Sequence, residues 1–153
     1  MDAVVAQAMA KWPNVPAVYG WLSLDRRGNW LIKGERIANQ ALRDFISRNY
    51  EHDAHGCWYF QNGPQRVYVA LAYTPLVVHY DGDELRDHCG RRFEARATYL
   101  DEEGSVLIEG DAVIALLDDR DLARYADAEA SLQRITGAEI QARFGFVKDP
   151  KAG

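Results

Sequence analysis

Hydrophobic and polar residues alternate through most of the chain. In one stretch the apolar residues instead recur with helical spacing. Residues 17–24 are β-branched and aromatic, residues 25–28 (Asp-Arg-Arg-Gly) have turn chemistry, and residues 29–33 are again largely apolar. This pattern predicts a β-hairpin. In residues 36–49 apolar side chains recur three to four positions apart, which predicts an amphipathic helix; they are Ile37, Leu42, Phe45 and Ile46.

The rest of the central chain reads as short strands. Residues 57–61 and 66–72 flank Asn62-Gly63-Pro64, the strongest hairpin signal in the sequence. Further apolar segments, separated by turn residues, cover 76–80, 84–88, 92–100, 105–109 and 112–117. Short connections favour antiparallel neighbours. The predicted fold class is therefore α+β and β-rich, with an antiparallel, hairpin-built sheet of roughly eight strands and the amphipathic helix packed on it.

The two ends of the chain have weaker patterns. Residues 2–11 predict a short helix, which Pro13 and Pro16 end by favouring extended backbone. Residues 119–130 are compatible with a helix, and residues 144–147 with a closing strand.

An internal similarity links two of the predicted hairpins. Residues 24–34 and 100–110 align without gaps and match at six of eleven positions, at an offset of 76 residues. Shared turn chemistry and a repeated structural unit both explain such a match. The length of 153 residues suits a single domain. We therefore predict one domain over 1–153, built from two quasi-repeated halves at about 17–80 and 92–147.

Charge and composition exclude several classes of protein. The net charge of −5 argues against a protein that neutralises nucleic-acid phosphates. The apolar stretches are shorter than a membrane span, and no secretion signal is evident, so a cytoplasmic location without membrane attachment is expected. In that compartment Cys57 and Cys89 are expected to be free thiols.

A family resemblance rests on the order of several short motifs. They are Gly28-Asn29-Trp30, Gly34 and Ile37, then the helix, then Asp53, Gly56-Cys57-Trp58-Tyr59-Phe60, Arg66-Val67-Tyr68-Val69 and Thr74-Pro75. This order, over about residues 17–80, resembles a family of uncharacterised bacterial proteins of unknown function with repeated β-hairpin and helix motifs. The resemblance implies a regulatory or signalling role and transfers no reaction and no functional residue.

Candidate binding residues gather at the predicted Asn62-Gly63 hairpin. Alternation places Tyr19 and Trp21 on one face of their strand and turns Tyr68 away from its apolar neighbours. Flat rings beside amide groups bind peptides and small molecules. The candidate site for a ligand or partner is Gln61, Asn62, Gln65, Arg66 and Tyr68.

All four histidines and both cysteines lie between residues 52 and 89, which raises a second hypothesis. Zinc prefers about four nitrogen or sulfur ligands, and the candidate set is His52, His55, Cys57 and His88. The spacing matches no standard zinc motif, so no cofactor is predicted and zinc is kept as the alternative. No phosphate-binding glycine loop, dinucleotide motif or nucleophile elbow is present in the sequence.

These observations favour a non-enzymatic binding or regulatory module whose partner is a protein or a small molecule. Two alternatives stay open: a metal protein or small enzyme that uses the histidine and cysteine cluster, and a homo-oligomeric scaffold assembled through sheet edges.

Overall fold

The computed structural model describes residues 1–11 and 17–152, so the predicted extended backbone at Pro13 and Pro16 lies outside the described residues. The chain divides into two compact units. The first consists of Met1–Asp25, Asn29–Ala72 and Phe146–Gly153, and the second of Arg26–Gly28 and Tyr73–Gly145. None of the helices in the described part of the chain is long and apolar enough to span a bilayer.

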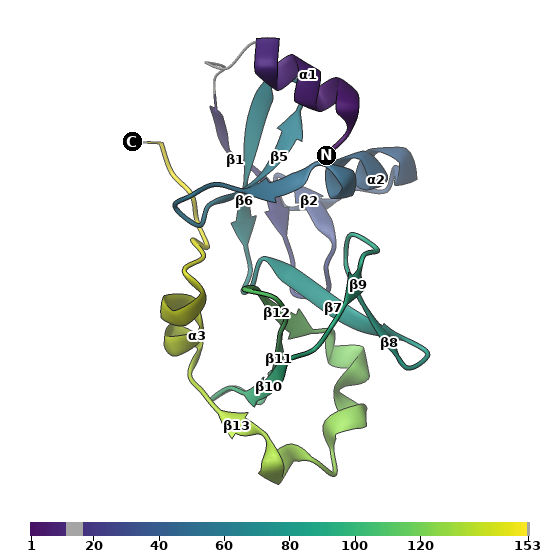
Figure 1. Ribbon diagram of the computed structural model, residues 1–153, viewed down its shortest axis with the longest axis vertical. Helices are drawn as coiled ribbons and strands as arrows, with labels where there is room; N and C mark the ends of the chain where they lie inside the picture. The colour runs from purple at the N-terminus through teal and green to yellow at the C-terminus, as the bar shows by residue number, and fades with distance from the viewer. Residues whose placement is uncertain (12–16, 153) are drawn as a thin grey trace. The chain divides into compact units, whose positions relative to one another are not determined.

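The first unit is a six-stranded sheet with two helices (Figure 1), and its strand order is β3-β2-β1-β6-β5-β4. Its elements are α1 (Ala3–Lys11), β1 (Ala17–Leu24), β2 (Trp30–Ile32), β3 (Glu35–Arg36), α2 (Gln40–Arg48), β4 (Tyr50–His52), β5 (Trp58–Asn62) and β6 (Gln65–Leu71). The predicted hairpin at Asn62-Gly63 is confirmed, because β5 and β6 pair from Asn62 and Gln65 onward. The buried side chains of this unit include Leu24, Trp30, Tyr50 and Val69.

The second unit is a seven-stranded sheet in the order β13-β10-β11-β12-β7-β8-β9. Its elements are β7 (Leu76–Asp81), β8 (Glu84–Asp87), β9 (Arg92–Phe93), β10 (Ala97–Leu100), β11 (Val106–Glu109), β12 (Ile114–Leu117), β13 (Gln133–Arg134) and α3 (Gly137–Phe144), with 3-10 helices at Asp119–Tyr125 and Glu129–Ser131. Its core includes Leu107, Ile108, Ile114 and Ile140, which are completely buried.

The β-rich α+β prediction is confirmed, but the prediction of one purely antiparallel sheet is wrong. Three strand pairs run parallel: β1 with β6, β7 with β12, and β10 with β13. Short turns dictate direction only for strands that follow one another. The parallel partners are separated by long stretches of chain, and α2 lies between β1 and β6 in sequence, so their direction depends on which pairing buries most apolar surface.

Helix boundaries follow the capping residues. Helix α2 begins later than the predicted residue 36, because Glu35 and Arg36 form strand β3 and the Asn39 side chain caps the helix by accepting from the Leu42 backbone N–H at 3.0 Å. The predicted strand at 144–147 is wrong. Helix α3 ends there, and the Thr136 hydroxyl caps its start by accepting from the Glu139 backbone N–H.

The sequence similarity between residues 24–34 and 100–110 corresponds to one turn geometry. Four turns of the described chain share it: Asp25–Asn29, Asp53–Cys57, Asp87–Arg91 and Asp101–Ser105. In each, the aspartate N–H donates to the carbonyl four residues on, and its carboxylate accepts from the N–H of that same residue. The glycine before the last residue has φ between 81° and 87°. We call these the Asp–Gly turns.

The strands that precede the two matching turns pair in the same way. Strand β1 is antiparallel to β2 and parallel to β6, and β10 is antiparallel to β11 and parallel to β13. Local turn chemistry accounts for the matching turn residues, and two repeated halves remain a prediction from the sequence.

Candidate functional site

An apolar pocket of about 510 Å³ lies in the first unit, between helix α2 and one face of the sheet. The helix contributes Leu42, Phe45 and Ile46, whose spacing of three and four residues puts them on one face. Phe45 meets Phe60 of β5 edge to face, with 5.5 Å between ring centroids. The other apolar side chains come from the strands and are Val18, Trp21, Leu22, Ile32 and Val67.

An irregularity in β1 shapes this pocket. Val18 pairs with Val67 and Leu22 with Val69, so four residues of β1 match two of β6, and Gly20 lies in this bulge with φ of 77°. The bulge breaks the alternation of side chains. Trp21 therefore lines the pocket, whereas Tyr19 stacks on Tyr68 with ring centroids 4.9 Å apart. The prediction that Tyr19 and Trp21 share one face is wrong for this reason.

Two neutral amides are the polar members of the pocket wall. Asn62 and Gln65 end β5 and begin β6, at the hairpin that the sequence singled out. Amide side chains offer both hydrogen-bond donors and acceptors without a charge. Among the described residues that line the pocket, none is an acid, a base, a histidine or a cysteine.

The other three predicted binding residues do not line the pocket. Gln61 is 1% exposed, and its amide nitrogen donates to the carbonyl oxygens of Gly63 and Gln65, which closes the hairpin. The guanidinium of Arg66 lies 4.3 Å from the ring centroid of Tyr59. The Tyr68 ring is buried against Tyr19. The structure thus separates the five predicted residues into two groups.

Electrostatics beside Tyr68 favour a stable, unreactive arrangement. Burial alone would raise the pKa of Asp53, but hydrogen bonds from the backbone N–H groups of Cys57 and His55, and from the Tyr68 hydroxyl, outweigh it and lower the pKa. Burial, and then the nearby Asp53 charge, raise the pKa of Cys57. Its thiol therefore stays protonated, which is the opposite of what a cysteine nucleophile requires. Both cysteines are free, as predicted.

The residues of the zinc hypothesis have other contacts. The His52 ring lies 4.8 Å from that of Trp58, and the backbone N–H groups of His55 and Cys57 donate to Asp53. His88 belongs to the second unit, where its Nδ1 accepts from the Val77 N–H at 3.2 Å. Among residues 1–11 and 17–152, no three histidine, cysteine, aspartate or glutamate side chains form a group that could hold a metal ion. The zinc hypothesis gains no support from this geometry.

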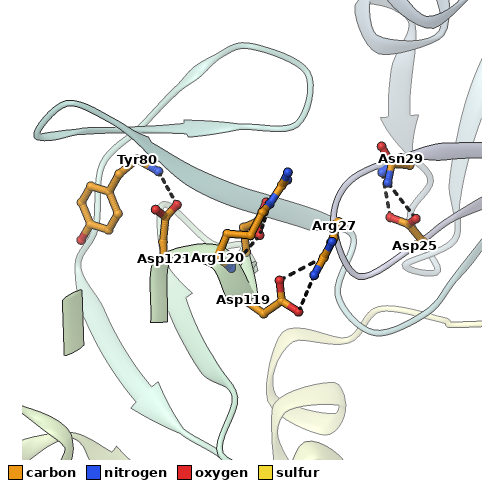
Figure 2. A network of polar contacts seen from close by, with 8 residues as sticks. Asp25, Arg27, Asn29, Tyr80, Asp119, Arg120 and Asp121 are labelled. Carbon is orange, nitrogen blue, oxygen red and sulfur yellow. Dashed lines mark hydrogen bonds and ion pairs between the residues drawn. The ribbon is translucent and has the colours of Figure 1, made fainter. Parts of the chain in front are cut away.

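A second, polar pocket of about 410 Å³ lies in the second unit, and its walls include His79, His88 and Asp118. Charged side chains of its walls bond to other groups of the protein (Figure 2). Arg27 pairs with Asp119 at 3.1 Å, and Asp121 accepts from the Tyr80 N–H at 2.9 Å. Burial would raise the pKa of Asp118, but the hydrogen bonds and charge of Arg120 outweigh it and lower the pKa. These contacts tie the aspartates to neighbouring side chains and backbone.

A family model, DUF2944, described as a protein of unknown function (DUF2946), matches residues 1–151. The chain belongs to this family. The resemblance to uncharacterised proteins of unknown function seen in the sequence is thereby confirmed. A search of curated proteins finds no significant match.

Two solved structures share the fold, and both are DUF1285 family proteins. The one from Silicibacter pomeroyi DSS-3 has 18% sequence identity and a TM-score of 0.56, covering 83% of this chain and 84% of that chain. The one from Shewanella baltica OS155 has 11% identity and a TM-score of 0.51, covering 69% and 90%. At these identities the likeness concerns the fold alone.

The sequence indicates part of the candidate site. The turn signal singles out Asn62 and Gln65, and the helical spacing predicts an apolar face at Leu42, Phe45 and Ile46. From the sequence alone, that face is expected to pack in the core. Periodicity shows which side of a helix is apolar. It does not show whether the space between that side and the sheet is filled by side chains or left as a pocket.

Proposed function

We propose that this protein is a non-enzymatic binding module that takes a small, largely apolar molecule into the pocket beneath α2. The observation that carries the proposal is the pocket itself: about 510 Å³ in volume, walled by α2 and the sheet. Binding sites for small molecules usually measure roughly 300–1,000 Å³ and are mostly apolar, with a few placed polar groups.

The wall chemistry supports a binding role over catalysis. Apolar side chains stabilise a ligand by removing its hydrocarbon surface from water, and Asn62 and Gln65 can orient one polar group. General acid–base catalysis needs a titratable side chain at the reacting atoms. The described lining residues include none.

The mouth of the pocket is accessible. Trp21 is 51% exposed and Leu42 is 38% exposed, although both line the pocket. Large apolar side chains at the surface of a pocket are typical of ligand-binding sites. A small molecule could therefore enter past these two side chains without unfolding of α2.

Filling the pocket tests this function. In Val67→Trp the indole projects from the sheet into the pocket, between Val18 and Phe60, and we expect the affinity for the neutral apolar dye Nile red to fall at least about tenfold. The larger side chain enters unfilled space, so the thermal midpoint should change by no more than about 5 °C. Fluorescence titration and thermal denaturation measure the two effects.

Arg66→Gln provides the matched control, because Arg66 is the next residue on β6 but does not line the pocket. We expect it to bind Nile red like the wild type. Loss of dye binding in Arg66→Gln, or full binding in a folded Val67→Trp, would contradict the proposal. Leu42→Trp fills the same space from the helix side, at a more exposed position, and should also weaken binding.

A further inference from the structure

A lysine lies beside the mouth of the apolar pocket. Lys33 Nζ is 4.7 Å from the ring centroid of Trp21, a residue that lines the pocket. The backbone N–H of Lys33 also donates to the Trp21 carbonyl at 2.9 Å. The backbone bond fixes where the lysine side chain starts, and the cation–π contact holds its ammonium group over the indole.

The backbone at Lys33 is unusual for this residue type. Lys33 has φ of 49° and Gly34 has φ of 81°, so both central residues of the turn between β2 and β3 are in the left-handed region. Asparagine, aspartate and glycine favour the first position of such a turn. A lysine there is strained, and residues held in sparse backbone regions concentrate at functional sites.

The charge of Lys33 is not matched within the described chain. Among the described residues, no carboxylate lies within 4.0 Å of its Nζ, whereas Arg48 and Lys151, also in the first unit, pair with Asp2 and Asp149. An ammonium group at the edge of an apolar pocket is complementary to an anionic group on a bound molecule.

The sheet register places this cation at one end of the pocket. Ile32 pairs with Leu22, and the Lys33 N–H bonds to the Trp21 carbonyl, so Lys33 lies at the Leu22 end of the part of β1 that lines the pocket. Gln65 immediately precedes the residue that pairs with Ala17, and so lies at the other end of that part. A ligand with its apolar body under α2 can therefore present one polar end to Lys33.

We propose that the ligand is a carboxylic acid with an apolar body, and that its carboxylate pairs with Lys33. This inference rests on the proposed function of the pocket. A carboxylate accepts hydrogen bonds from an ammonium group, and such charge-assisted hydrogen bonds are stronger than those between neutral groups. Lys33 thus selects the anion, and the apolar walls select its hydrocarbon part.

Two probes of the same chain length test the assignment, namely decanoate and decanol, titrated calorimetrically into the wild type, Lys33→Gln, Lys33→Arg and Lys151→Gln. We expect Lys33→Gln to weaken decanoate binding about fivefold and to leave decanol binding unchanged. Lys33→Arg retains the charge and should retain most of the decanoate affinity. Lys151→Gln makes the same charge change away from the pocket lining and should have no effect.

The outcomes separate the two proposals. If decanol binds and Lys33→Gln weakens both probes equally or neither, the carboxylate assignment is wrong and the pocket stands. If neither probe binds or displaces Nile red from the wild type, both proposals are wrong. A selective loss of decanoate in Lys33→Gln, reduced at high salt because ions screen the pair, supports the assignment.

Discussion

Gly28→Ala is expected to lower the free energy of unfolding by about 3 kcal/mol. Gly28 has φ of 81°, which an L side chain adopts only with strain, and a Cβ there would lie 2.6 Å from the Cβ of His88. The His88 atom is the one next to the backbone, so the clash can be relieved only if the backbone moves. Chemical denaturation followed by circular dichroism measures the loss.

Another Asp–Gly turn offers a matched control. Gly104 occupies the equivalent position there, with φ of 82°, and a Cβ added to it would have no heavy atom within 4 Å. Gly104→Ala should therefore cost only the backbone strain, about 1–2 kcal/mol. An equal fall in the free energy of unfolding of the two variants would show that the close approach to His88 does not contribute to the effect of Gly28→Ala.

Two further Asp–Gly turns predict opposite dependences of stability on pH. The pKa of Asp53 is lowered, because hydrogen bonds to its carboxylate outweigh burial. Its charged form therefore stabilises the fold above the unfolded pKa, and this contribution is lost as the pH falls through the folded pKa. We expect Asp53→Asn to be about 1 kcal/mol less stable than the wild type at pH 7, with the difference vanishing in acid.

At the equivalent position of its own turn, Asp87 is 5% exposed, and burial raises its pKa despite hydrogen bonds from the N–H groups of Arg91 and Cys89. Its neutral form is the stabilising one. That contribution is complete below the unfolded pKa and is lost as the pH rises through the folded pKa. Asp87→Asn, which stays neutral, should gain about 1 kcal/mol relative to the wild type at pH 7.

Urea denaturation from about pH 3 to pH 7 compares the two variants. The difference from the wild type should grow with pH for both, negative for Asp53→Asn and positive for Asp87→Asn. The same sign in both would mean that the turn, and not the burial of each carboxyl, governs stability. Since both variants replace the same residue type in the same turn, each controls for the loss of a carboxylate.

Local features of this fold can be predicted because short segments specify them. Asn62-Gly63 marks a hairpin, and the spacing of Leu42, Phe45 and Ile46 marks an amphipathic helix. The start of α3 also has a local signal, because the Thr136 hydroxyl accepts from the Glu139 backbone N–H and donates to the Glu139 carboxylate. Residues 144–147 are mostly apolar and aromatic, which favours a strand, but Phe144 ends α3 and Gly145 caps it with φ of 68°, donating its N–H to the Gln141 carbonyl.

Features that depend on distant segments cannot be predicted in this way. The bulge at Gly20 changes the face of Trp21, and nothing in the local alternation reveals it, because glycine adopts positive and negative φ with equal ease. The position of Lys33 over Trp21 follows from that bulge and from the β2–β3 turn together. Shifting the alternation of side chains along a strand by one residue moves each side chain to the opposite face of the sheet.

The amino-acid pattern is sufficient for the β-rich class, the hairpins, the helix with its apolar face, and the turns built on aspartate and glycine. The parallel pairings, the separation of Asn62 and Gln65 from Arg66 and Tyr68, and the pocket under α2 emerge only when the chain is folded. The difference lies in the range of the interactions. Turn and helix preferences act within a few residues, whereas strand partners and unfilled volume depend on how surfaces from distant segments meet.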